Sequence, residues 1–143
     1  MHRSQNIAGR LIEVRVKPPL TLDEVKQFVV EHKAMVSRIP DRYVGVVDLH
    51  RANVFPPEIA DALVQLLSQM ANRVERTAFL IGKSAVFALQ IERVIRQAAN
   101  PNRKSFREPG PLKEWLGEVL NADERFRLDG FLAEVLASED GAP

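Results

Sequence analysis

The stretch Tyr43-Val44-Gly45-Val46-Val47-Asp48-Leu49 is nearly all apolar before its aspartate. A continuous apolar run of this length is typical of a strand that is buried on both faces, as the central strands of parallel sheets are. Pro56 and Pro57 follow at a point where the start of a helix tolerates proline. The stretch therefore predicts a central strand that leads into a helix, and with them an α/β fold.

Strand and helix periods alternate on both sides of this stretch. Before it, residues 11–16 alternate with a period of two. Residues 22–38 place apolar side chains, with His32 among them, at helical spacings behind the capping box of Thr21 and Glu24. After it, the expected elements are a helix over 57–73, a strand over 77–81, a helix over 85–99, a short strand over 104–107, a helix from about 112, and an additional helix within 121–137.

This order predicts a mainly parallel sheet with helices on its faces. We expect one α/β domain over residues 1–143, with a small, mainly parallel (mixed) sheet of four to five strands and an extra C-terminal helix. That helix is expected to pack on the domain, cap a pocket or pair with a second subunit, and residues 138–143 are expected to fray. Its predicted apolar stripe consists of Phe126, Phe131, Leu132, Val135 and Leu136.

The composition is that of a folded globular protein, with 45% apolar and 27% charged residues. The chain has no cysteine, which excludes disulfides, thiolate chemistry and cysteine-based zinc sites. No apolar run approaches the roughly 20 residues that span a bilayer, so we expect no membrane insertion. These features favour a cytoplasmic protein.

The net charge of +1 conceals two opposite blocks. Residues 73–107 carry 8 basic and 2 acidic side chains, and residues 108–143 carry 3 basic and 9 acidic ones. The blocks either neutralise each other within the fold or mark partner surfaces. Because the sequence pI is only about 8.1 and the aromatic residues fall mainly on apolar faces, we expect no binding of nucleic acid.

Catalytic motifs find little support in the sequence. The segment Ile81-Gly82-Lys83-Ser84 is similar to the end of a phosphate-binding loop, but the position five residues before Gly82 is Thr77, which leaves no room for such a loop. Asp48 and His50 share one side of a strand end, yet two ligands do not define a metal site. We therefore predict no enzymatic activity, no cofactor and no metal.

Two weaker binding features remain. The free amides at the start of the helix over 85–99, together with Lys83 and Ser84, form a candidate anion site, to which Arg93 and Arg96 contribute if the helix turns them toward it. The alternative is an ordinary strand-to-helix turn that is capped by Ser84.

Three segments together resemble the STAS / SpoIIAA-like superfamily. They are VGVVDL over 44–49, RTAFLIGKSAVFALQIERVI over 76–95, and SFREPGPLKEWLGEVL over 105–120, which ends in a helix with the Trp115-Leu116 pair. The resemblance covers roughly residues 8–120. It implies a small sheet backed by helices and a binding or regulatory role. In some members that role involves apolar or lipid-like ligands.

In anti-sigma-factor antagonists of this superfamily, a serine after the central strand is phosphorylated. The corresponding region here, residues 53–57, contains no serine or threonine, so the resemblance does not carry over the phosphorylation switch. The leading hypothesis is a non-catalytic domain that docks a protein partner or itself through the loop that carries Arg51, Asn53 and Phe55. Phe55 is a candidate hot spot if it is exposed, and otherwise it folds back onto the core. The alternative hypothesis is a module for a small apolar or anionic ligand, with its pocket at the carboxyl ends of the strands.

Overall fold

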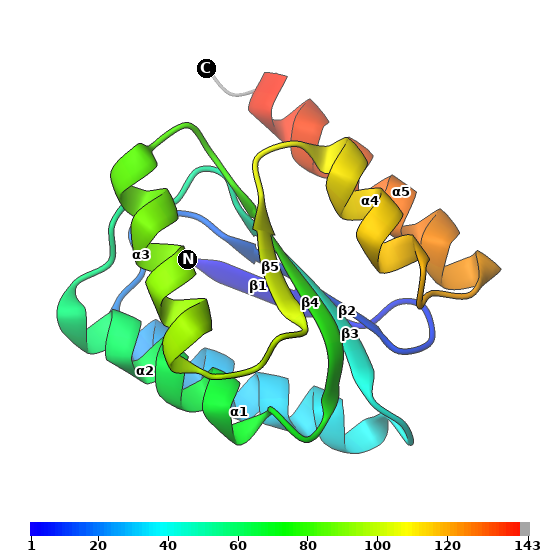
Figure 1. Cartoon of the computed structure of the whole chain (residues 1–143), viewed down its shortest axis with the longest axis horizontal. Coiled ribbons are helices and arrows are strands. Elements are labelled where there is room, and N and C mark those ends of the chain that lie inside the picture. Colours follow the sequence, from blue (N-terminus) through cyan, green and yellow to red (C-terminus); the bar gives the residue numbers. More distant parts are fainter. Residues whose placement is uncertain (141–143) are drawn as a thin grey trace.

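The computed structural model describes residues 1–140, and the side chains of residues 1–137. It contains one five-stranded sheet in the order β1-β2-β3-β4-β5, in which β1 is antiparallel to β2 and the other strands run parallel (Figure 1). The strands are β1 (His2–Gln5), β2 (Leu11–Val16), β3 (Tyr43–Leu49), β4 (Val74–Ile81) and β5 (Arg103–Phe106). The helices are α1 (Leu22–Arg38), α2 (Pro57–Gln69), α3 (Ala85–Gln97), α4 (Pro109–Gly117) and α5 (Ala122–Asp140).

The helices cover the two faces of the sheet unequally. Each parallel strand is the spatial neighbour of the next one in the chain, and right-handed crossovers in one direction place all their helices on one side. Helices α1, α2 and α3 therefore lie on one face, and α4 and α5 lie on the other (Figure 1). Each face has its own apolar core, so the predicted α/β domain with a mixed sheet is confirmed.

Two element boundaries differ from the prediction. Strand β1 was not predicted, because the sequence His2-Arg3-Ser4-Gln5 has no apolar alternation, and it is held by its backbone pairing with β2. The helix predicted over 57–73 ends at Gln69, and Val74 is the buried first residue of β4 rather than part of the helical stripe. Helical spacing alone could not separate these assignments, because Val74 continues the helical stripe formed with Leu66 and Met70.

Helix α5 packs on its own domain. Its buried side chains Leu128, Phe131, Leu132 and Val135 join the core with residues of β2, β3 and β4. The predicted stripe was wrong at two positions, because Phe126 is 81% exposed and Leu136 is 42% exposed. The helix continues to Asp140, so the expected fraying is not seen there, and residues 141–143 lie outside the described part of the chain.

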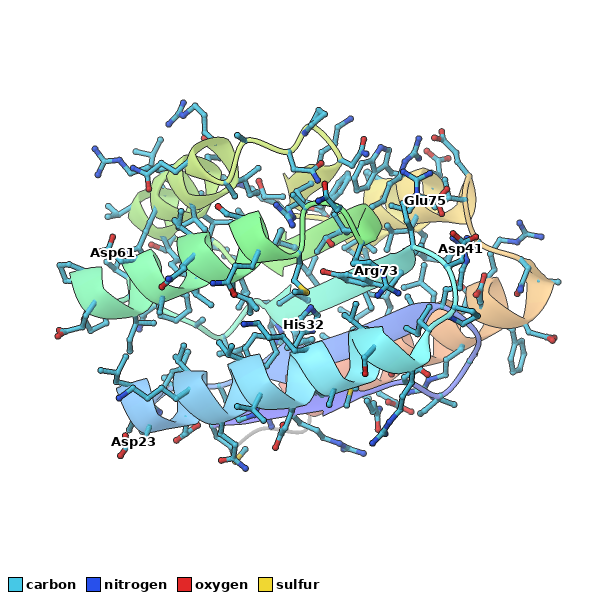
Figure 2. The ribbon with its side chains drawn as sticks, turned by 90° about the horizontal axis from the view of Figure 1, so that it is seen from below. Asp23, His32, Asp41, Asp61, Arg73 and Glu75 are labelled. Atoms are coloured by element: carbon cyan, nitrogen blue, oxygen red, sulfur yellow. The ribbon has the colours of Figure 1, made fainter. Side chains whose placement is uncertain are left out.

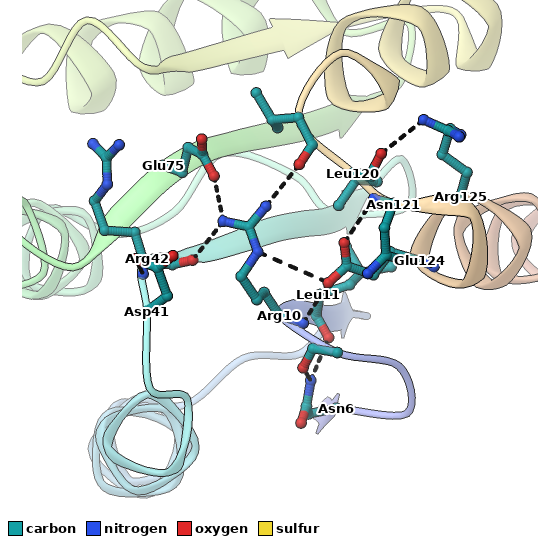
Figure 3. Close-up of polar contacts among 12 residues, drawn as sticks. Asn6, Arg10, Leu11, Asp41, Arg42, Glu75, Leu120, Asn121, Glu124 and Arg125 are labelled. Carbon is teal, nitrogen blue, oxygen red and sulfur yellow. Dashed lines mark hydrogen bonds and ion pairs between the residues drawn. The ribbon is translucent and has the colours of Figure 1, made fainter.

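The start of α5 is fixed by a capping box and by Arg10. The Asn121 side chain accepts from the Glu124 backbone N–H at 2.9 Å, and the Glu124 carboxylate accepts from the Asn121 backbone N–H at 2.9 Å. Glu124 also accepts from the Arg10 backbone N–H at 2.6 Å, while the Arg10 guanidinium pairs with Glu75 and donates to the Val119 carbonyl (Figure 3). These bonds join the first loop of the chain to its last helix.

A fully buried carboxylate makes a second connection between β2 and α5. Glu13 is 1% exposed, and its two oxygens accept from Nε and Nη2 of Arg127, each at 2.7 Å. Arg127 also donates to the Glu134 carboxylate, which lies two turns further along the same side of α5. Glu13 is thus buried together with its partner Arg127.

No helix within the described residues is both long and apolar enough to span a bilayer.

Candidate functional site

An apolar cavity of about 70 Å³ lies between the sheet and helices α1, α2 and α3. Its walls come from all of these elements, with Val14, Val47 and Phe79 on the sheet side and Phe28 and Leu63 on the helix side. Protein interiors rarely keep voids larger than a water molecule, so a cavity of this size in a short chain requires an explanation. Its place below the middle of the sheet differs from the pocket that the sequence predicted at the carboxyl ends of the strands.

One end of the cavity is polar. His32 enters it from α1, and Tyr43 and Thr77 enter it from β3 and β4. The His32 Nε2 atom lies 3.2 Å from the Tyr43 hydroxyl, and His32 Nδ1 is buried without a hydrogen bond. The buried Thr77 hydroxyl interacts with the Tyr43 hydroxyl without a hydrogen bond of good geometry. Figure 2, which looks onto α1 and α2, shows His32 lying between these two helices. The cavity therefore ends in polar atoms with unused hydrogen-bonding capacity.

The register of the sheet explains how this polar end forms. Gly45, Thr77 and Arg103 lie side by side on β3, β4 and β5, so their side-chain positions share the face under the helices. Gly45 has no side chain, and a Cβ atom there would lie 3.1 Å from the Thr77 hydroxyl. The glycine thus lets the Thr77 side chain pack closely over the backbone of β3 in the middle of the sheet.

Arg103 lies behind this end of the cavity and is 3% exposed. It donates to the Leu67 carbonyl through Nη2 and interacts with the Tyr43 hydroxyl. Its Nε and Nη1 atoms are buried without a hydrogen bond of good geometry. No carboxylate within residues 1–137 pairs with it, so Arg103 is a buried cation without a counterion from the described part of the chain.

Burial fixes the protonation states of the other two groups. It lowers the pKa of His32 to about 4, with a further decrease from the nearby charge of Arg103, so the imidazole is neutral at neutral pH. Burial also raises the pKa of Tyr43 to about 12, which keeps the phenol protonated. The polar side chains that line this end of the cavity are therefore uncharged, and the positive charges of Arg103 and Arg73 lie near Tyr43.

A groove of about 310 Å³ lies outside the cavity, between α1 and α2. Val25 and Leu66 line both the groove and the cavity, so these two side chains separate the cavity from the groove.

The carboxyl ends of the strands form a second, open groove of about 530 Å³. Of the predicted anion site, only Lys83 lines it, together with His50 and Arg107. Ser84 instead caps α3, because its hydroxyl accepts from the Phe87 backbone N–H at 3.2 Å. The ordinary-turn alternative therefore holds for Ser84.

The two predicted arginines of that site lie elsewhere. Arg93 and Arg96 are exposed on the outer side of α3 and do not line this groove, so the prediction that gathered all four residues is wrong.

The structure explains why a glycine stands at position 82, since a Cβ atom at this position would lie 2.5 Å from the His50 carbonyl oxygen. The glycine lets two strand-to-helix loops approach closely.

The predicted docking loop is only partly exposed. Asn53 is exposed and Arg51 is half-buried, but Phe55 is 6% exposed and packs edge-to-face against Phe87. The Gln90 side chain holds the loop, because it bonds to both the N–H and the carbonyl of Phe55 at 2.8 Å. The prediction that Phe55 is a surface hot spot is therefore wrong, and the alternative that it folds back is confirmed.

A different apolar surface lies beside this loop. Val54 on the loop is 50% exposed, and Val86 and Leu89 on α3 are 65% and 66% exposed. We call these three residues the α3 patch. Arg93 and Arg96 continue the same side of α3 at spacings of four and three residues after Leu89, so the patch has a basic end.

The side chains of Asp48 and His50 form a hydrogen-bonded pair, with Arg15 Nε 3.6 Å from the other oxygen of Asp48. Asp48 Oδ1 also accepts from the His50 backbone N–H at 3.1 Å, as expected of an aspartate that caps the loop after a strand. Within the described residues, no group of three or more potential ligands gathers to hold a metal ion.

Sequence reasoning missed the polar end of the cavity. His32 was assigned to an apolar helical stripe, Thr77 to a buried strand, and Arg103 to no function. A histidine within such a stripe was one available signal, because buried histidines need partners. The approach of residues 32, 77 and 103 depends on the sheet register, which no local pattern reveals.

No protein-family model and no curated protein matches this chain. The resemblance to the STAS / SpoIIAA-like superfamily thus rests on the residues quoted for it and stays a prediction.

Proposed function

We propose that this chain is a non-catalytic, cytoplasmic binding module with a STAS / SpoIIAA-like fold, and that its ligand is a small molecule held in the cavity between the sheet and helices α1, α2 and α3. The observation that carries the proposal is the cavity itself, which is apolar over most of its wall and ends in a few converging polar atoms. This combination is the usual design of small-molecule sites, where apolar walls supply affinity and a few polar groups fix orientation.

The position of the cavity also supports a binding role. It lies between two layers, and on the helix side Val25 and Leu66 line both the cavity and the α1–α2 groove. An entry route therefore requires rotation of side chains and no unfolding of the sheet.

The first test compares intact masses under native and denaturing conditions. A ligand that purifies with the protein adds mass only under native conditions. Val47→Phe, which directs a ring into the cavity, should remove the added mass, and Val30→Phe at an exposed position of α1 should retain it.

A second measurement covers the case of a ligand lost in purification. Xenon enters apolar cavities, so it should shift the NMR methyl signals of Val14 and Val47 but not those of Val46 on the opposite face. The proposal would be contradicted if the protein carried no added mass and xenon caused no shift of the Val14 and Val47 signals.

The α3 patch favours a second candidate function, which is docking of a protein partner or of a second copy. Exposed apolar side chains that gather on one surface with a charged rim are typical of interaction sites. A photo-crosslinking residue at position 89 should then give a discrete adduct, whose mass distinguishes a second copy from another protein. The same residue at the exposed position Lys113 is the control.

The crosslinking result has a clear negative. Adducts at positions 89 and 113 in equal amounts, or at neither position, would contradict docking through the α3 patch. Leu89→Asp should remove partner binding without unfolding the domain, because the side chain is 66% exposed.

A further inference from the structure

The open groove at the carboxyl ends of the strands collects side chains from three consecutive loops. His50 directly follows β3, Lys83 lies just after β4, and Arg107 directly follows β5. These strands are neighbours and run parallel, so their carboxyl ends meet at one edge of the sheet. All three side chains line the groove of about 530 Å³, although they are far apart in the chain.

The backbone holds the first two of these loops close together. A Cβ atom at position 82 would lie 2.5 Å from the His50 carbonyl oxygen, so only a glycine lets the loop of Lys83 pass the loop of His50 at this separation. The His50 ring is held in turn, because its Nδ1 atom pairs with the Asp48 carboxylate. This wall of the groove is therefore shaped by the fold itself.

The groove has more cations than carboxylates. Lys83 and Arg107 are exposed, and neither side chain forms an ion pair or a hydrogen bond within the described part of the chain. Other surface cations do, such as Arg76 with Glu118. Glu108 is the one carboxylate among the described residues that line the groove. The two cations outnumber it, so the groove attracts anions.

Apolar side chains form the rest of the wall. Leu80, Ile81 and Val135 are buried beneath the groove, and Leu136 on α5 lines it with 42% of its surface exposed. The volume lies within the range of about 300–1,000 Å³ that is typical of small-molecule sites. An inorganic anion would leave the apolar wall in water. An anionic group that carries an organic body would cover it.

We infer that this groove binds a small phosphate monoester, with its phosphate between Lys83 and Arg107 and its organic body against Leu80, Val135 and Leu136. A phosphate monoester carries a charge of about −1.5 to −2 at neutral pH, so it pairs with both cations, whereas a carboxylate carries one charge. The guanidinium donates two parallel hydrogen bonds to the phosphate, and the ammonium acts as a point charge. Because one exposed ion pair contributes little, pairing with both cations decides the preference. The site is separate from the cavity and does not depend on it.

The test titrates the full chain with phenyl phosphate at neutral pH and follows the backbone amide signals of Gly82, Lys83 and Arg107 by NMR. Benzoate has the same ring with a single charge, and inorganic phosphate has the charge without the ring. We expect phenyl phosphate to shift these signals. Benzoate should bind about fivefold more weakly, and inorganic phosphate at least about tenfold more weakly.

Four variants locate the two parts of the ligand. Lys83→Gln and Arg107→Gln should each lower the affinity for phenyl phosphate roughly threefold to fivefold. Arg96→Gln removes the same charge from an exposed position of α3 outside the groove and should change nothing. Leu136→Ser should lower the affinity for phenyl phosphate but not for inorganic phosphate. All four side chains are exposed, and circular dichroism confirms that each variant is folded.

Three results would overturn the inference. In the first, phenyl phosphate leaves the three amide signals unchanged, or Arg96→Gln weakens its binding as much as Lys83→Gln and Arg107→Gln do, which is a response to net charge alone. In the second, benzoate binds as tightly as phenyl phosphate, which rules out pairing with both cations. In the third, inorganic phosphate binds as tightly as phenyl phosphate, which rules out the apolar wall. The cavity is tested independently by xenon.

Discussion

The two faces of the sheet bury ionisable groups in opposite ways. On the face under α4 and α5, Glu13 is fully buried but receives two hydrogen bonds from Arg127, and Glu124 receives bonds from Arg10 and Asn121. On the face under α1, α2 and α3, Arg103 is buried with two unused donors beside an apolar cavity.

This difference shows on which face of the sheet the chain itself supplies a partner for every buried charge. Each buried carboxylate that α5 covers finds its partner within the chain, which is the rule for buried ions in stable structures. The face under α1, α2 and α3 departs from this rule at Arg103, which has no carboxylate partner within the described residues. Arg15 on the other face also has two buried donors without a hydrogen bond, but its Nε atom lies 3.6 Å from Asp48. Departures of this kind concentrate at sites of function, so the comparison supports the proposed binding site on the α1–α3 face.

The largest expected effect is the loss of helix α5 from the α4–α5 face. A chain that ends at Asn121 removes the side chains that cover Leu11, Val44 and Val46, and it leaves Glu13 without its cation. We expect this truncated chain to lack a cooperative unfolding transition in urea. A matched pair in the full chain is Phe131→Ser, which should cost about 3–5 kcal/mol, and Phe126→Ser, which should change stability by at most about 0.5 kcal/mol. A folded truncated chain would show that α5 is an accessory element.

The second prediction tests paired against unpaired arginine. Arg127→Ala leaves the buried Glu13 uncompensated and should lower the free energy of unfolding by about 3–5 kcal/mol in urea denaturation. Arg103→Met removes a buried charge that has no carboxylate partner within the described residues and should change it by at most about 1 kcal/mol, in either direction. The double variant Glu13→Leu/Arg127→Met should recover most of the first loss. Equal costs for the two single variants would contradict the comparison.

The third prediction concerns the loop that holds Phe55. Phe55→Ala should cost about 3–4 kcal/mol, because it removes a buried ring that packs on Phe87. Val54→Ala, one residue earlier but half exposed, should cost less than about 0.5 kcal/mol. Both are measured by thermal and urea unfolding, and a small effect of Phe55→Ala would mean that the ring is exposed in solution.

The fourth prediction is a dependence of stability on pH. The pKa of His32 is about 4 in the folded protein and about 6.5 in the unfolded chain. Above pH 6.5 neither state binds the proton, so the free energy of unfolding has its full value. Between pH 6.5 and 4 only the unfolded state binds it, and the free energy of unfolding should fall by roughly 3 kcal/mol in total.

The control for this pH dependence is His32→Gln. This variant should lose most of that decrease, whereas His2→Asn should keep it. An unchanged slope in His32→Gln between pH 6.5 and 4 would show that His32 is solvated or protonated in the fold.

The smallest expected effect compares two adjacent valines of β3. Val46 points into the close-packed face under α5, and Val47 lines the cavity on the other face. Val46→Ile should destabilise the domain by about 1–2 kcal/mol through overpacking. Val47→Ile should be neutral or stabilise it by less than about 1 kcal/mol, because the added methyl group enters empty space. The same loss at both positions in urea denaturation would mean that the cavity is closed in solution.

The sequence predicted most helices and strands but not which of their side chains meet in the folded chain. Period-two spacing located β2, a continuous apolar run located β3, and helical spacing located α1, α3 and α5 within a few residues, because each of these patterns depends only on neighbouring residues. It failed for β1, whose polar residues are held by backbone pairing, and at Phe126, whose burial depends on how α5 rotates against the sheet. It also placed Arg93 and Arg96 in the predicted anion site with Lys83 and Ser84. The orientation of α3 leaves both arginine side chains exposed and outside that groove.

Local chemistry by itself determined that this chain forms an α/β domain without cysteine, with the capping residues Thr21 and Ser84 and a covered central strand, because periodicity and capping act over a few neighbouring residues. Only the tertiary structure decided that Thr77 and His32 meet at one end of an apolar cavity, with the buried Arg103 beside Thr77 in the sheet, while Glu13 meets Arg127 on the other face. These groups lie between 26 and 114 residues apart in the chain. Sheet register and helix packing bring them together, and neither is encoded in any short segment.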